Sequence, residues 1–307
     1  MARERVLAAA DASVVLTRAF VTSPVLSDYW RLTKPEVTFL VAVTTAAGFY
    51  LGCPAPSPIP WIPFLHTLLG TLLVASGAAV LNQWMEYPFD ATMRRTARRA
   101  VAAGRIDPKR ALMFGAFLSL AGLAYLLLAA GGLPSLLALA TLAGYLCIYT
   151  PLKRITPLCT LVGAIPGAVP PLIGWTAARG RLDGEALILF GIIFLWQFPH
   201  FMSIAWMYRD DYARARYLVL PDSPARVRVA ALQTLLPLVL LLPVSVLPVR
   251  TGGANVYYCV GALLLGLGFL FFGSRFVLQR SGPAARQLLM ASIIYLPALL
   301  LLLTLSA

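Results

Sequence analysis

Apolar stretches of about twenty residues recur along the whole chain and constrain its fold more than any other feature. A helix of that length spans the hydrocarbon layer of a bilayer. Inside that layer, a chain must pair its backbone polar groups within helices or a closed barrel. We therefore predict an all-α, polytopic membrane bundle of about nine transmembrane helices. The N-terminal arm covers residues 1–34 and the transmembrane domain 35–307, with spans near 36–52, 62–83, 110–130, 133–150, 157–177, 185–207, 229–248, 255–274 and 286–305.

Positive charge gathers in the connections that follow every second span. The 307 residues carry 25 Lys and Arg against 12 Asp and Glu, and a net charge of +13 could also indicate a nucleic-acid-binding protein. However, 22 of the 25 basic residues lie in the arm or after the second, fourth, sixth and eighth spans. This asymmetry is typical of cytoplasmic loops. We expect a multi-pass protein of a bacterial inner membrane with a cytoplasmic N-terminus, an outer C-terminus and no nucleic-acid partner.

Three oxygen-bearing side chains follow one another at helical spacing where the second span ends. Asn82, Glu86 and Asp90 of "NQWMEYPFD" are four residues apart and share one helix face. Such oxygens suit Mg²⁺, which is usually held by one or two carboxylates, water and substrate phosphates. Asn82 and Asp90 lie roughly 12 Å apart on an ideal helix, so either the helix bends or two ions bind. We expect Pro88 to end or kink the helix; an ordinary solvated helix end is the alternative.

Basic side chains stand beside these oxygens and beside a second acidic loop. Asp210 and Asp211 follow the sixth span in "YRDDY", and the fourth span closes on "YTPLKR". The basic residues of the three clusters include Arg95, Arg99, Lys153, Arg154 and Arg209. Guanidinium groups bind phosphate in bidentate fashion. An apolar bundle capped by such a site suits a prenyl diphosphate, with its diphosphate in the loops and its hydrocarbon chain among the helices.

The same motifs resemble the UbiA superfamily of intramembrane prenyltransferases. The resemblance rests on "NQWMEYPFD" with "RRTARRAVAAGRI", on "YTPLKRITP" and on the acidic loop after the sixth span. Within the family, "RLTKPEV", "VGAIPGAVPPLIGW", "WQFPHF" and "YRDDY" are similar to the members that modify heme. The resemblance implies Mg²⁺-dependent transfer of farnesyl from farnesyl diphosphate to a vinyl group of heme B. Water adds in the same conversion, which gives heme O and diphosphate.

The resemblance also implies roles for individual residues. The implied metal ligands are Asn82, Glu86, Asp90, Asp210 and Asp211. The implied catalytic residues are Asn82, Glu86, Asp90, Asp211 and Lys153. The implied substrate-binding residues are Arg95, Arg99, Arg154, Arg209, Tyr149 and His200. Tyr149 would line the path of an allylic cation or serve as an interfacial anchor, and His200 would ligate heme iron or be structural.

Two other functions stay open on the residues alone. A UbiA-type enzyme acting on an aromatic or quinone precursor would carry the same diphosphate site. An ion-coupled transporter would also place acids in a membrane, although its acids usually lie near the bilayer midplane. Here nearly all acids lie at one face of the bundle. A heme product would also favour contact with downstream heme-modifying or oxidase-assembly proteins.

Overall fold

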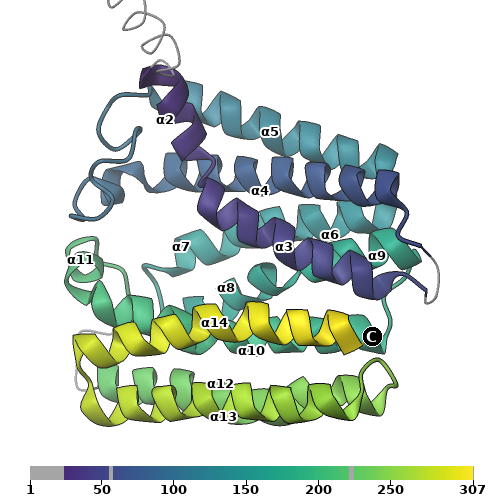
Figure 1. Ribbon diagram of the computed structural model, residues 1–307. Helices are drawn as coiled ribbons and strands as arrows, with labels where there is room; N and C mark the ends of the chain where they lie inside the picture. Colours follow the sequence, from purple (N-terminus) through teal and green to yellow (C-terminus); the bar gives the residue numbers. More distant parts are fainter. Residues whose placement is uncertain (1–23, 55–57, 221–224, 307) are drawn as a thin grey trace, which may run out of the picture.

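The computed structural model describes residues 24–54, 58–220 and 225–306. In this part of the chain every regular element is a helix, and most helices lie side by side along one direction (Figure 1). The predicted all-α bundle is therefore confirmed. Residues 1–23 of the predicted N-terminal arm lie outside the described residues.

Nine helical segments of the described residues are long and apolar enough to cross a membrane. Seven are single helices: α3 (Pro35–Gly52), α4 (Trp61–Asp90), α5 (Pro108–Ala129), α10 (Gly184–Met207), α12 (Ala225–Arg250), α13 (Val256–Gln279) and α14 (Gly282–Ser306). The fourth segment joins α6 (Gly132–Ala143), the π-helical η1 (Gly144–Tyr149) and α7 (Thr150–Leu152). The fifth joins α8 (Cys159–Ala168) and α9 (Pro170–Arg179), and two short helices, α2 (Pro24–Leu32) and α11 (Arg209–Arg214), lie outside the spans.

Helix α4 extends seven residues further than the span predicted to end at residue 83, and it runs through Pro88. Proline cannot donate a backbone hydrogen bond, but the Ala91 N–H donates to the Tyr87 carbonyl at 3.1 Å and closes the turn beyond it. Membrane helices tolerate proline where surrounding groups satisfy the freed backbone. The expectation that Pro88 ends the helix is therefore wrong, and the polar residues of α4 stay on one continuous helix.

Small residues let the helices approach at backbone distance. A Cβ atom on Gly174 of α9 would lie 2.0 Å from the Thr45 carbonyl oxygen of α3, and one on Gly48 would lie 2.0 Å from the Pro171 carbonyl oxygen. A Cβ atom on Gly77 of α4 would lie 2.2 Å from the Ser119 hydroxyl oxygen of α5. Lipid tails are as apolar as leucine, so close packing of this kind holds membrane helices together. It also fixes α4 relative to its neighbours.

The polar connections gather at one end of the bundle. The loop after α4, helix α7 and helix α11 lie at this end, and the C-terminus lies at the other (Figure 1). The Arg105 guanidinium donates to both carboxylate oxygens of Asp28, at 2.7 and 2.9 Å, and so ties the loop after α4 to α2. The same guanidinium lowers the pKa of Asp28 below its ordinary value. This polar end is where the predicted site residues lie.

Candidate active site

Three predicted ligands line one buried face of α4. Asn82, Glu86 and Asp90 are only 1%, 6% and 1% exposed. The Asn82 side-chain amide donates to a carboxylate oxygen of Glu86 at 3.0 Å and to the Thr150 hydroxyl of α7 at 3.2 Å. Buried polar groups persist only where they are paired. The face therefore belongs to a polar site inside the bundle, and the solvated helix end considered above is excluded.

A cation from a different segment meets each of these three side chains. The Lys153 ammonium lies 2.8 Å from a carboxylate oxygen of Glu86, and the Arg99 guanidinium lies 2.7 Å from one of Asp90. The Lys34 ammonium donates to the Asn82 side-chain oxygen at 3.2 Å. Because all three pairs are largely buried, their mutual attraction is weakly screened. Three convergent cations can hold the charge of an anion such as a diphosphate.

Lys34 is a site residue that the sequence reasoning missed. It precedes α3 in the left-handed backbone region, with φ 50°, and this turns its side chain toward α4. Burial, together with the nearby Arg99, lowers the pKa of Lys34 to about 7. Burial also lowers the pKa of Lys153, but the neighbouring Tyr149 and Glu86 together outweigh burial and raise that pKa above its ordinary value. The sequence feature that could have identified Lys34 is its place directly before Pro35, at the start of the first span.

The second acidic loop joins the first through Asp211. Its two carboxylate oxygens accept hydrogen bonds from the backbone N–H groups of Arg94 and Arg95, each at 3.2 Å, and Arg214 forms an ion pair with it. Asp211 is buried, whereas the Asp210 side chain is 83% exposed and lies 3.8 Å from Arg209. The structure therefore brings Asp211, but not Asp210, against the loop that follows α4.

Aromatic rings lie under the basic side chains. The Lys153 ammonium lies 4.5 Å from the centre of the Tyr149 ring, and Tyr149 stacks on Tyr145 with ring centres 5.5 Å apart. Tyr217 packs beside Phe89, and burial raises the pKa of its hydroxyl. Such rings attract positive charge through their faces, so Tyr149 and Tyr145 can stabilise a cation next to the anion site.

The remaining predicted arginines stack on aromatic side chains at the rim. Arg154 lies 4.4 Å from the ring centre of Phe89, and Arg95 lies 4.8 Å from that of Tyr208. Arg209 lies 5.7 Å from the ring centre of Trp206. Stacking leaves the edges of a guanidinium group available for hydrogen bonds. These arginines therefore surround the buried cluster without sharing its ion pairs.

The oxygen set fits a metal that shares its ligands with a substrate. One carboxylate oxygen of Asp90, Oδ1, is buried without a hydrogen-bond partner among the described residues. No group of three or more His, Cys, Asp and Glu side chains in the described part of the chain lies close enough to hold one ion. Mg²⁺ typically takes only one or two carboxylates and completes its shell with water and phosphate oxygens. The residues present therefore fit Mg²⁺ in company with a diphosphate.

His200 lies apart from this cluster, on the α10 face that meets α14. Its Nδ1 atom lies 2.8 Å from the Ser292 hydroxyl, and its ring stacks on Trp196 with ring centres 4.8 Å apart. Trp196 in turn donates to the Ser292 carbonyl at 2.8 Å. The ring is thereby fixed through Nδ1, and its Nε2 atom makes no hydrogen bond within the described residues.

The fold and the site together define an intramembrane prenyltransferase. The sequence model of the UbiA prenyltransferase family matches residues 41–296, so the chain belongs to this family of enzymes. A protoheme IX farnesyltransferase of Solibacter usitatus (strain Ellin6076) is 47% identical over 281 residues, which cover 89% of this chain and 96% of that relative. The predicted resemblance to the family is therefore confirmed.

Solved structures share the fold at low sequence identity. A structure from a study of digeranylgeranylglyceryl phosphate synthase has a TM-score of 0.74 and 16% sequence identity, and the match covers 92% of this chain and 98% of that chain. A UbiA homolog from Archaeoglobus fulgidus bound to GPP and Mg²⁺ has a TM-score of 0.61 and 13% identity, over 88% of this chain and 99% of its own. At such identities the likeness establishes the arrangement of the helices.

Proposed function

We propose that this enzyme transfers a farnesyl group from farnesyl diphosphate to a vinyl group of heme B. Water adds to the neighbouring vinyl carbon, and the products are heme O and diphosphate. The observation that carries the acceptor is the 47% identity, over nearly the full length of both chains, to a protein named protoheme IX farnesyltransferase. The buried cluster of carboxylates and cations supports the diphosphate donor.

The first task of the site is to receive the negative charge of the leaving diphosphate. Lys34, Lys153 and Arg99 converge there, and as the carbon–oxygen bond breaks they stabilise the growing charge. When bound, Mg²⁺ would add the same neutralisation at the phosphate oxygens. Asp90 and Asp211 are the residues we propose to hold the ion, with Asn82 and Glu86 beside them. Preorganised charge of this kind needs no rearrangement during the reaction.

The second task is to protect the allylic cation until the vinyl group attacks it. Tyr149 and Tyr145 present stacked ring faces beside Lys153, and such faces stabilise a passing cation. The apolar helices exclude water from the early intermediate. After the carbon–carbon bond forms, positive charge on the adjacent carbon is quenched by water, which loses one proton.

The third task is to hold the porphyrin, and we assign part of it to His200. Its Nδ1 atom is engaged by Ser292, which leaves Nε2 as the nitrogen able to ligate the heme iron. The stacked Trp196 keeps the ring from turning. A histidine oriented through its second nitrogen is the usual arrangement for a metal ligand.

We further propose that the polar end of the bundle faces the cytoplasm of a bacterium. The basic residues concentrate in the connections at this end, as the positive-inside rule requires. Farnesyl diphosphate would then enter with its head group in the aqueous phase and its tail among the helices. The C-terminus would lie on the outer side of the inner membrane.

The test is a reaction of the purified protein with heme B, farnesyl diphosphate and Mg²⁺, followed by mass analysis of the heme. Wild-type protein should add a farnesyl group and one water, and chelation should stop the reaction until Mg²⁺ is restored. Asp90→Asn and Asp211→Asn should each lower turnover by about 10²-fold or more, because each removes charge beside the leaving group. Farnesylation of an aromatic or quinone precursor with unmodified heme would refute the proposed acceptor.

A further inference from the structure

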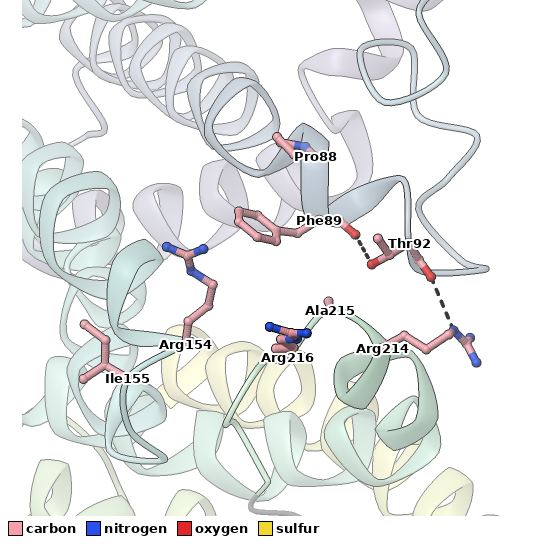
Figure 2. A pocket seen from close by; sticks show the side chains of 8 residues that line it. All are labelled: Pro88, Phe89, Thr92, Arg154, Ile155, Arg214, Ala215 and Arg216. Carbon is pink, nitrogen blue, oxygen red and sulfur yellow. Dashed lines mark hydrogen bonds between the residues drawn. The ribbon is translucent and has the colours of Figure 1, made fainter.

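An open cleft of about 690 Å³ lies at the polar end, beside the buried cluster and outside it (Figure 2). Its walls come from the end of α4, the loop after α7 and the segment after α11, and its lining residues are Pro88, Phe89, Thr92, Arg154, Ile155, Arg214, Ala215 and Arg216. The Leu218 N–H donates to the Lys153 carbonyl at 2.6 Å, which fixes two of these walls to each other. Ligand pockets commonly have volumes of about 300–1,000 Å³.

The cleft combines three guanidinium groups with apolar surface and has no acidic side chain in its lining. Arg214 is already engaged, because it forms an ion pair with Asp211 and donates to the Thr92 carbonyl at 3.3 Å. Arg154 stacks on Phe89, and neither it nor Arg216 forms an ion pair with any described residue. Figure 2 shows both bordering the same open space from different segments. Two such arginines are a recognition element for two carboxylates.

We propose that Arg154 and Arg216 bind the two propionate groups of the heme acceptor; this inference rests on the proposed function and adds the residues that orient its substrate. Heme B carries its propionates on the edge of the porphyrin opposite its vinyl groups. An anchored propionate edge at the mouth of the bundle therefore turns the vinyl edge inward, toward the farnesyl carbon. Phe89 and Ile155 supply apolar contact for the ring beside the arginines.

This assignment separates two kinds of cation at one end of the molecule. Lys34, Lys153 and Arg99 are largely buried and paired with polar groups of α4, as a site for diphosphate and metal requires. Arg154 and Arg216 are exposed at the rim and have no carboxylate partner in the described residues. Carboxylates of the substrate would neutralise the positive charge of these two arginines.

The experiment compares heme B with its dimethyl ester, in which both propionates are neutral. Each is titrated into the purified protein in detergent, and binding is followed by heme absorbance. Wild-type protein should bind the diacid at least about tenfold more tightly, since each charge-assisted contact contributes on that scale. Arg154→Gln and Arg216→Gln should each reduce this preference. Arg154→Lys and Arg216→Lys should keep part of it, because the charge remains.

Arg286→Gln is the matched control, because Arg286 is an exposed arginine near the start of α14, at the same end of the bundle and outside the cleft. It should keep the full preference for the diacid. Binding of inorganic diphosphate should be unchanged in all variants. Equal wild-type affinity for diacid and diester overturns the inference, even if a glutamine variant does not fold. Loss of diphosphate binding in the Arg154 and Arg216 variants, with the heme preference intact, also overturns it.

The same assay keeps this inference apart from the proposed reaction. Wild-type protein that makes heme O but does not distinguish diacid from diester would reject the propionate site alone. Wild-type protein that prefers the diacid but transfers no farnesyl group would reject the reaction while supporting the propionate site.

Discussion

The ion pair between Lys153 and Glu86 offers a quantitative test of how the buried cluster is held. Its two side chains are 12% and 8% exposed, and the charged atoms lie 2.8 Å apart. Lys153→Met leaves the Glu86 carboxylate buried without its paired ammonium, beside the Asn82 amide that donates to it at 3.0 Å. Stranding one member of a buried pair typically costs about 3–5 kcal/mol. Proton uptake limits this cost, since protonating a glutamic acid of ordinary pKa at pH 7 costs about 3.7 kcal/mol.

We therefore expect Lys153→Met to lower the free energy of unfolding by about 3–4 kcal/mol. Glu86→Met should be similarly harmful, because it strands the ammonium. The double variant should be more stable than either single variant, because two methionines of similar volume leave no unpaired charge in the buried site. All three should lose farnesyl transfer. Unfolding would be measured by tryptophan fluorescence during titration of mixed micelles with a denaturing detergent.

The exposed pair of Arg209 and Asp210 is the control for this cycle. Its charged atoms lie 3.8 Å apart and its side chains are 40% and 83% exposed. Arg209→Gln and Asp210→Asn should show a coupling energy below about 1 kcal/mol, as exposed pairs usually do. Costs of Lys153→Met and Glu86→Met that simply add in the double variant would refute the reasoning, because they would show that the two side chains do not stabilise each other.

Three further predictions follow from contacts away from this pair. Asp28→Asn should lower the free energy of unfolding by about 1 kcal/mol at pH 7. Because Arg105 lowers the folded-state pKa of Asp28, this difference from wild type should disappear as the pH falls through that lowered pKa. Unfolding measured at pH 7 and at pH 3 would test this. Gly174→Ala places a Cβ atom 2.0 Å from the Thr45 carbonyl oxygen. It should lower the free energy of unfolding in detergent by about 1–3 kcal/mol. An unchanged free energy of unfolding would reject the backbone contact. His200→Ala should alter the absorbance spectrum of bound heme while inorganic diphosphate still binds; weaker binding of both ligands with an unaltered spectrum would make this histidine structural.

The membrane bundle could be predicted from the sequence because its cause is local. Burial in lipid requires continuous apolar helices, so nine spans can be recognised from composition alone. The shared face of Asn82, Glu86 and Asp90 also follows from helical periodicity. The structure bears out this periodicity and carries it through Pro88, because the next turn closes with its own hydrogen bond.

Pairing between segments was decided only by the tertiary structure. Lys34 meets Asn82 across 48 residues, and Lys153 meets Glu86 across 67 residues. No local pattern encodes these pairings, because they depend on how closely the helices pack through their glycine-containing faces.

The different positions of Asp210 and Asp211 show the same limit within one motif. Successive residues on a helix point about 100° apart, so only one of the pair can face the loop after α4, and Asp211 does so across 117 residues. Composition and periodicity thus determined which polar groups this membrane protein carries and at which end they gather. The packing of helices against one another decided which of them meet, because a buried charge is stable only where another segment supplies its partner.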